Sequence, residues 1–452
     1  MADRQSPSAQ GDAAFSRGRG LGVLLLGLST CVAATASGQE IDREPINYST
    51  ATPRNVVAQL QERLASGAAK LDFEGHGYLR SLLRELDVPE SSQVLVFSKT
   101  SLQRDRISPK TPRAIYFNDD VMVGFCVRGR VIEIAAVDDA LGTAFYTLDQ
   151  TRREKPVAER QTESCLLCHG SSANQNFPGY LVRSLQVDRQ GNPLLANGTF
   201  RTDHTSPLAE RWGGWYVTGT SGGQKHMGNT ISRESSRSEE LAGADGVNVV
   251  DLKDRFTTAA YPTPHSDIVA LMVLEHQVGM LNRLARAGME TRMALHYERE
   301  FNKALGRPAD ERSDSARSRI RSVGEAVVQY MLFHDEARLT DRITGTSSFA
   351  SDFAARGPRD AKGRSLRDLD LNTRLFRHPC SYLIHSRAFE SLPEEVKDHI
   401  YQRLWEILNG RGTGKDDPRV VAEDGGAIIE ILRETKRDLP DYWKAPPAPG
   451  SR

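Results

Sequence analysis

Two cysteines and a histidine stand close together in the stretch Cys165-Leu166-Leu167-Cys168-His169. Residues three apart on a helical turn lie on the same side, so both thiols can reach one flat ligand. Thiols at this spacing can form thioethers with the two vinyl groups of one porphyrin, and the histidine that follows can bind the iron from the proximal side. The spacing therefore predicts covalent attachment of one haem c.

Three other kinds of site also use a CxxC pair: a thioredoxin-like redox pair, half of a zinc site and a structural disulfide. A redox CxxC lies at a strand-to-helix junction, whereas a charged loop containing Arg152, Arg153, Glu154 and Lys155 precedes this one. Zinc needs a second pair of ligands at similar spacing, and the sequence contains no other CxxC. These observations favour haem over the alternatives.

The iron held by His169 also has a sixth position. Methionine there gives a high-potential electron carrier, a second histidine gives a lower potential, and an open position permits ligand binding or peroxide chemistry. Met227 lies downstream in a segment rich in glycine and aromatic residues, Arg211 to Gly228, of the kind that can wrap a flat ligand. We predict Met227 as the sixth ligand, with His226 as the alternative and His204 as a third candidate.

The N-terminal segment has the pattern of a secretory signal peptide. Arg17 and Arg19 precede an apolar run from Leu21 to Leu28, and Ala34-Thr35-Ala36 has the form of a cleavage site. We therefore expect residues 1–36 to be removed and the mature protein to be periplasmic or in the cell envelope. Association with the membrane is expected only if this segment stays uncleaved.

The balance of charge is neutral, with 59 basic and 59 acidic residues, and does not favour a nucleic-acid partner. In an oxidising compartment the remaining cysteines, Cys126 and Cys380, can form a disulfide or stay as two buried thiols. The sequence leaves both possibilities open.

Hydrophobic periodicity predicts an α+β protein, mainly α, with a small antiparallel β-sheet and a c-type haem segment followed by a helical C-terminal half. We expect an α+β haem-bearing domain over 37–260, a helical domain over 261–443 and a disordered tail over 444–452. The expected strands cover 93–97, 114–117, 121–127, 131–137, 144–148 and 180–187. The expected helices cover 56–64, 79–86, 163–170, 266–287, 290–306, 313–339, 393–410 and 427–436.

The longer pattern of motifs also carries a resemblance. Tyr116 to Asp120, then Cys165 to His169, Arg211 to Tyr216 and His226-Met227-Gly228-Asn229 resemble a family of exported bacterial proteins, found in planctomycetes, with a mono-haem cytochrome c-type domain. The resemblance covers most of the mature chain. It implies haem binding and electron transfer, and it supplies no substrate.

Together these patterns predict an exported mono-haem c-type cytochrome that transfers electrons to or from a redox partner protein. A single domain of roughly a hundred residues can enclose a haem, and this chain is about four times longer. The excess keeps two alternatives open: a haem-dependent peroxidase or oxidoreductase with an open or displaceable sixth ligand, and a non-enzymatic haem sensor or scaffold.

Overall fold

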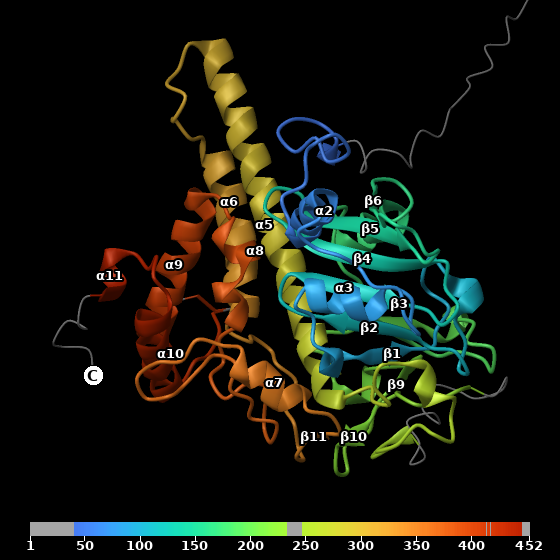
Figure 1. Ribbon diagram of the computed structural model, residues 1–452. Coiled ribbons are helices and arrows are strands. Elements are labelled where there is room, and N and C mark those ends of the chain that lie inside the picture. The colour runs from blue at the N-terminus through green and yellow to red at the C-terminus, as the bar shows by residue number, and fades with distance from the viewer. Residues whose placement is uncertain (1–39, 233–245, 413, 416, 445–452) are drawn as a thin grey trace, which may run out of the picture. The chain divides into compact units, whose positions relative to one another are not determined.

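A seven-stranded antiparallel sheet in strand order β6-β5-β4-β3-β2-β1-β9 forms the centre of the fold. The structure is a computed structural model that describes residues 40–232, 246–412, 414–415 and 417–444 (Figure 1). The proposed signal peptide and residues 445–452 of the proposed tail lie outside the described residues. The seven strands are β1 (Val94–Val96), β2 (Arg113–Phe117), β3 (Val121–Phe125), β4 (Val131–Asp138), β5 (Gly142–Asp149), β6 (Ala158–Gln161) and β9 (Trp215–Tyr216).

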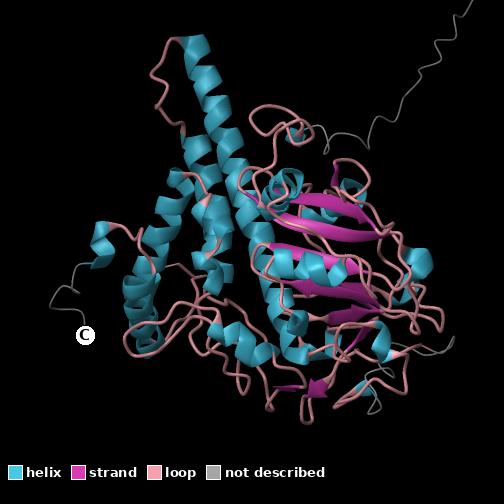
Figure 2. Cartoon of the chain, viewed as in Figure 1, coloured by secondary structure: helices cyan, strands magenta, loops and turns pink. Residues whose placement is uncertain are grey.

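Two small two-stranded sheets accompany it, one pairing β7 with β8 and the other pairing β10 with β11. Among the described residues, two α-helices precede the main sheet in the sequence, one lies between β6 and β9, and the others follow β9. Figure 2 shows the helices and strands in different colours. The short strands are β7 (Arg183–Leu185), β8 (Thr199–Arg201), β10 (Gly219–Thr220) and β11 (Thr344–Gly345). The helices are α2 (Val56–Ser66), α3 (Leu79–Glu85), α4 (Leu166–His169), α5 (Ile268–Leu305), α6 (Asp314–Met331), α7 (Phe349–Ala355), α8 (Arg387–Glu390), α9 (Glu394–Leu408), α10 (Ala422–Thr435) and α11 (Asp441–Lys444).

The expected mixture of helix and strand is confirmed, but the expectations of a mainly α protein and a small sheet are wrong. The structure is 38% helical and 14% strand, and its sheet has seven strands. The expected strands between residues 93 and 148 correspond to β1–β5. The short strands β6 and β9, which extend the sheet at its two edges, have too few alternating apolar residues to be recognised in the sequence.

Helices cover both faces of the sheet. One face packs with α2 and α3 in a core that contains Val57, Leu82, Val123 and Ile134. The opposite face, which carries Phe117, Met122 and Val137, shares a second core with α5, α6 and α9. Figure 1 shows α5 passing across one end of the strands, roughly perpendicular to them.

The helix α5 is continuous where the sequence predicts a break between residues 287 and 290. Its N-terminus is capped by Asp267, whose Oδ1 accepts a hydrogen bond from the backbone N–H of Val269 at 2.8 Å. The residues expected to open a second helix, Glu290 and Thr291, are buried within α5. Glu290 forms ion pairs with Arg286 and Arg319, so its carboxylate binds side chains and does not cap a new helix.

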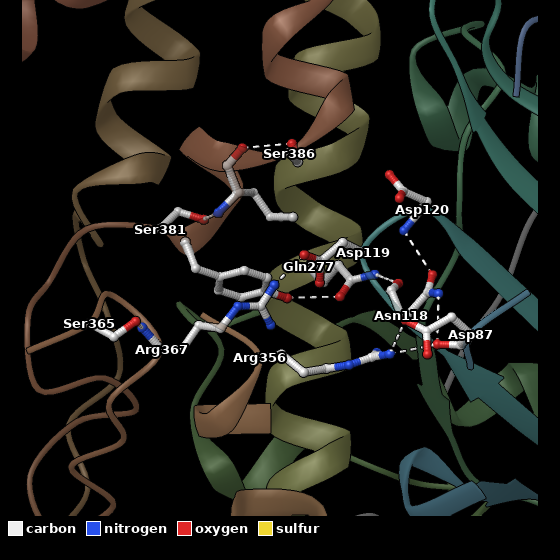
Figure 3. A network of polar contacts seen from close by, with 12 residues as sticks. Asp87, Asn118, Asp119, Asp120, Gln277, Arg356, Ser365, Arg367, Ser381 and Ser386 are labelled. Carbon is white, nitrogen blue, oxygen red and sulfur yellow. Dashed lines mark hydrogen bonds and ion pairs between the residues drawn. The ribbon is translucent and has the colours of Figure 1, made fainter. Parts of the chain in front are cut away.

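A polar network joins the C-terminal segments to the turn between β2 and β3 (Figure 3). Gln277 of α5 donates to the backbone oxygen of Asn118 at 2.7 Å and accepts from the Tyr382 hydroxyl at 2.8 Å. Arg367 forms an ion pair with Asp119, and its guanidinium lies 4.2 Å from the centre of the Tyr382 ring. The sequence predicts this turn at residues 118–120, and in the structure the turn also binds side chains of the C-terminal segments.

Candidate functional site

The CxxCH motif lies at the surface on the short helix α4, with Cys165 immediately before it. Cys165 is half-buried and Cys168 is exposed, and both thiols are free. Leu167 between them is 80% exposed, which is unusual for a leucine beside two accessible thiols. The surface of this turn is therefore apolar, reduced and open to a ligand.

The ring of His169 is held in the tautomer that a metal ligand requires. Its Nδ1 lies 2.8 Å from the backbone oxygen of Gly179, and because a carbonyl can only accept, Nδ1 must carry the proton. This leaves the lone pair on Nε2, for which the described residues offer no hydrogen-bond partner. Burial lowers the pKa of His169 and so favours the neutral ring.

Packing fixes the position of the motif on both sides. The His169 ring lies against the Phe145 ring of β5, with centroids 4.9 Å apart. Leu166 and Phe177 pack against a third core that contains Met289 and Met293 of α5. The motif therefore lies between β5 of the main sheet and the middle of α5.

The sheet beside the motif is incompletely covered on one face. In β2 and β4 fully buried residues alternate with half-buried ones, although both are central strands. The half-buried residues Ile115, Glu133, Ala135 and Thr147 share this face, which we call the half-open strip. Ile115 and Ala135 pack against the core that contains α5, whereas Glu133 accepts hydrogen bonds from side chains, so the strip is a partly polar, partly solvated part of an antiparallel sheet.

Charged groups connect the strip with the motif. Arg113 and Glu133 form an ion pair of 2.6 Å on this face, and the charges of both act on the pKa values of Cys165 and His169. Burial is the largest influence on Cys165 and raises its pKa to about 11. Redox-active CxxC pairs instead have a lowered pKa at the first cysteine, so this geometry disfavours thiol–disulfide chemistry.

Met227 is buried, with 7% of its surface exposed, and its Sδ accepts a hydrogen bond from the Ser184 hydroxyl at 3.7 Å. Met227 and Phe145 belong to none of the three hydrophobic cores of the described residues. Other buried apolar residues, such as Ile107, also lie outside these clusters. No contact among the described residues joins Met227 to His169, so the sixth ligand stays a prediction.

The two histidine alternatives have different surroundings. His226 is buried beside Trp212, its Nδ1 accepts the backbone N–H of Gly228 at 3.1 Å, and burial lowers its pKa to about 4. Its Nε2 is still available to bind iron, so His226 remains the alternative sixth ligand. His204 lies with its Nδ1 2.9 Å from Nδ1 of His276, inside a cluster of aromatic rings. That packing makes His204 a core residue.

The other two cysteines lie apart in the fold. Cys126 and Cys380 are both buried and free, and burial raises the pKa of each to about 12. Of the two possibilities that the sequence leaves open, the structure therefore has two buried thiols. Within the described ranges no group of three or more His, Cys, Asp or Glu side chains is arranged to hold a metal ion.

Sequence reasoning missed three parts of this site: the Gly179 carbonyl, the Phe145 ring and the half-open strip. The proline before Gly179 marks a turn, but nothing in the sequence says that the turn returns to His169. Compared with known proteins, the chain matches no family model, no curated protein and no solved structure. No helix in the described part of the chain is both long and apolar enough to cross a bilayer.

Proposed function

We propose that this chain is an exported mono-haem c-type cytochrome that transfers electrons. The observation that carries the proposal is the state of His169: its Nδ1 is bound to the Gly179 carbonyl, and its Nε2 is unpartnered beside two free cysteines. A proximal haem ligand needs this tautomer, because the iron binds the ring nitrogen that carries no proton.

In this proposal each residue has a distinct role. Cys165 and Cys168 hold the porphyrin edge through thioethers, His169 binds the iron, and Met227 occupies the sixth position, with His226 as the alternative. Bound haem would supply a one-electron couple at the iron. Phe145 keeps the His169 ring in place and limits the access of water.

The first experiment tests attachment. The chain is expressed with a secretion signal and haem-maturation machinery, and the purified protein is denatured to show whether the pigment stays bound. We expect one covalent haem per chain in the wild type and in the control Cys126→Ala. We expect none in the double variant Cys165→Ser/Cys168→Ser. Pigment that survives the double substitution would refute the proposal.

The second experiment separates an electron carrier from an enzyme. A ferrous haem that ignores carbon monoxide, with a methionine–iron charge-transfer band in the ferric state, supports electron transfer. Ready binding of carbon monoxide together with peroxide turnover would instead support a haem-dependent oxidoreductase or peroxidase.

The same spectrum distinguishes the two sixth ligands. Met227→Ala is expected to abolish the charge-transfer band, whereas His226→Ala is expected to leave it. If only His226→Ala changes the iron spectrum, Met227 is the wrong ligand.

We also propose periplasmic or envelope localisation and a redox partner protein, from the N-terminal sequence pattern and the chemistry of the motif. Sequencing the N-terminus of the secreted protein tests export. A start near Ser37 supports cleavage, while an intact N-terminus on a membrane-bound protein would show that the segment is an anchor.

A further inference from the structure

A groove of about 630 Å³ opens beside the segment that follows the haem motif. One wall is formed by 173–175 and 180–182 together with the β7–β8 hairpin, and the other by α5 and α6. Its volume lies within the range of small-molecule sites. We call it the α5–α6 groove.

Apolar side chains form part of the groove lining. Val182, Val278 and Val323 line the groove and are each less than a tenth exposed. Phe200, from the hairpin, is 37% exposed and also lines the groove. These walls suit the apolar body of a ligand and would contribute little to binding a small inorganic ion.

Positive charge predominates in the groove, where Arg201, Arg283 and Arg286 face a single acidic residue, Asp203. Each of the three arginines has at least one hydrogen-bond partner. Arg286 is paired with Glu290 at 2.6 Å and also donates to Gln175, and Arg201 donates to the backbone oxygen of Ala173.

Arg283 also has donors that no hydrogen-bond partner among the described residues occupies. It donates one hydrogen bond, to the backbone oxygen of Gly279 at 3.0 Å, and its Nη2 lies 4.0 Å from Asp203. No other hydrogen bond to this guanidinium is present among the described residues. Its side chain is 36% exposed, so the remaining N–H groups can reach a ligand in the groove.

The guanidinium of Arg283 is also held in one plane. It lies 3.7 Å from the centre of the buried Tyr330 ring, and the other neighbours of that ring include His204 at 4.1 Å. Stacking of this kind uses the face of the guanidinium and leaves its N–H edge free. A planar edge with parallel donors matches the two oxygens of a carboxylate.

We propose that the α5–α6 groove binds a small organic carboxylate, with its carboxylate at the free edge of Arg283 and its apolar body against the valine walls. The planar edge of the stacked Arg283 guanidinium matches the two oxygens of a carboxylate, and the valine walls favour an organic ligand with an apolar body over phosphate. The proposal goes beyond electron transfer and does not depend on it. It stands even if the CxxCH motif holds no haem.

The test uses benzoate as the probe on the full protein as purified, followed by calorimetry or by ligand-detected NMR. We expect benzoate to bind, and benzamide, which has the same ring without the charge, to bind roughly 10-fold or more weakly. We also expect inorganic phosphate not to compete. Equal binding of benzoate and benzamide, or full displacement of benzoate by phosphate, would overturn the proposal.

Substitutions locate the probe. Arg283→Gln is expected to weaken benzoate binding about 10-fold or more, and Arg283→Lys, which keeps the charge but loses the planar fork, is expected to recover only part of that loss. The control is Arg317→Gln, an α6 arginine that pairs with Asp314 away from the groove. If Arg283→Gln binds benzoate as tightly as the control does, the site is elsewhere. Should the Arg283 variants fail to fold, the comparison of benzoate with benzamide on the wild-type protein still decides.

Discussion

His204 and His276 form a buried pair whose geometry allows only one proton between them. Their Nδ1 atoms are 2.9 Å apart, so one ring must donate and the other accept. The Nε2 of His276 lies 2.8 Å from the Ser381 hydroxyl, and aromatic rings enclose the pair. Burial is the largest influence, and it holds the pKa of both histidines well below the ordinary value.

The pair predicts acid sensitivity. Because the folded-state pKa values lie below the ordinary histidine value of 6.5, the unfolded chain binds more protons once the pH falls below that value. The stabilisation is therefore complete above pH 6.5 and is lost as the pH falls. Other buried groups act in both directions: the pKa values of His226 and His385 are lowered to about 4, whereas those of Glu275 and Glu336 are raised to about 7.

Urea unfolding at about pH 8 and about pH 5 should thus show a lower free energy of unfolding at the acidic value. His276→Gln should flatten this dependence, and the surface substitution His334→Gln should leave it as in the wild type. An unchanged slope in His276→Gln would show that the pair titrates normally.

At this scale the sequence predicts only local relationships. The spacing of Cys165, Cys168 and His169 is visible because all three lie within one turn. The contacts that define their surroundings, to Gly179 and Phe145, depend on loops and strands whose paths no local pattern reveals. His204 and His276 are 72 positions apart in the sequence. Because local patterns do not connect such distant residues, the sequence predicts His276 only as part of an apolar stripe on a buried helix.

At the scale of elements, Gly279 in the middle of α5 shows how a residue that weakens a helix can be required by packing. A Cβ at this position would lie 1.9 Å from the hydroxyl of Tyr330. The glycine thus lets α6 approach α5 closely, and it places Tyr330 behind Arg283 in the groove. Gly426 in α10 is the opposite case, since a Cβ there would meet nothing within 4 Å.

This contrast gives a matched prediction for two helical glycines. Gly279→Ala should destabilise the protein by about 1–3 kcal/mol through overpacking. Gly426→Ala should stabilise it by about 0.5–1 kcal/mol, since alanine is the better helix former. Thermal unfolding checks both, and Tyr330→Phe, which removes the hydroxyl, should restore part of the loss in Gly279→Ala. Equal effects of the two alanine substitutions would contradict the packing argument.

The elements that the sequence predicts correctly are those with strong local periodicity. Alternation identifies β2 to β5, and helical spacing identifies α2, α3 and α9. Only β7 forms within the predicted strand 180–187, because the residues beside β7 bind loops and α5. The backbone N–H of Tyr180, for example, donates to the side chain of Asn282 in α5. The break placed within α5 follows from the cap-like Glu290 and Thr291, which tertiary contacts convert into interior helix positions.

At the scale of the whole molecule, the expected boundary between residues 260 and 261 crosses a shared core. Val94, Val96 and Phe117 of the sheet pack in the same cluster as residues of α5, α6 and α9. The Arg367–Asp119 ion pair and the bonds of Gln277 add polar contacts across the same line (Figure 3). Because they share this core, we expect that neither residues 37–260 nor residues 261–443 fold without the other.

Separate expression of residues 37–260 and 261–443 tests this dependence. We expect 261–443 alone to lack a cooperative thermal transition, because Ile268 and Leu271 of α5 lose the partners that now leave both completely buried. Co-expression of the two fragments should restore a cooperative transition, because the shared core can then form between them. A fragment 261–443 that melts cooperatively on its own, near the midpoint of the full chain, would instead show that the helical part is an autonomous domain.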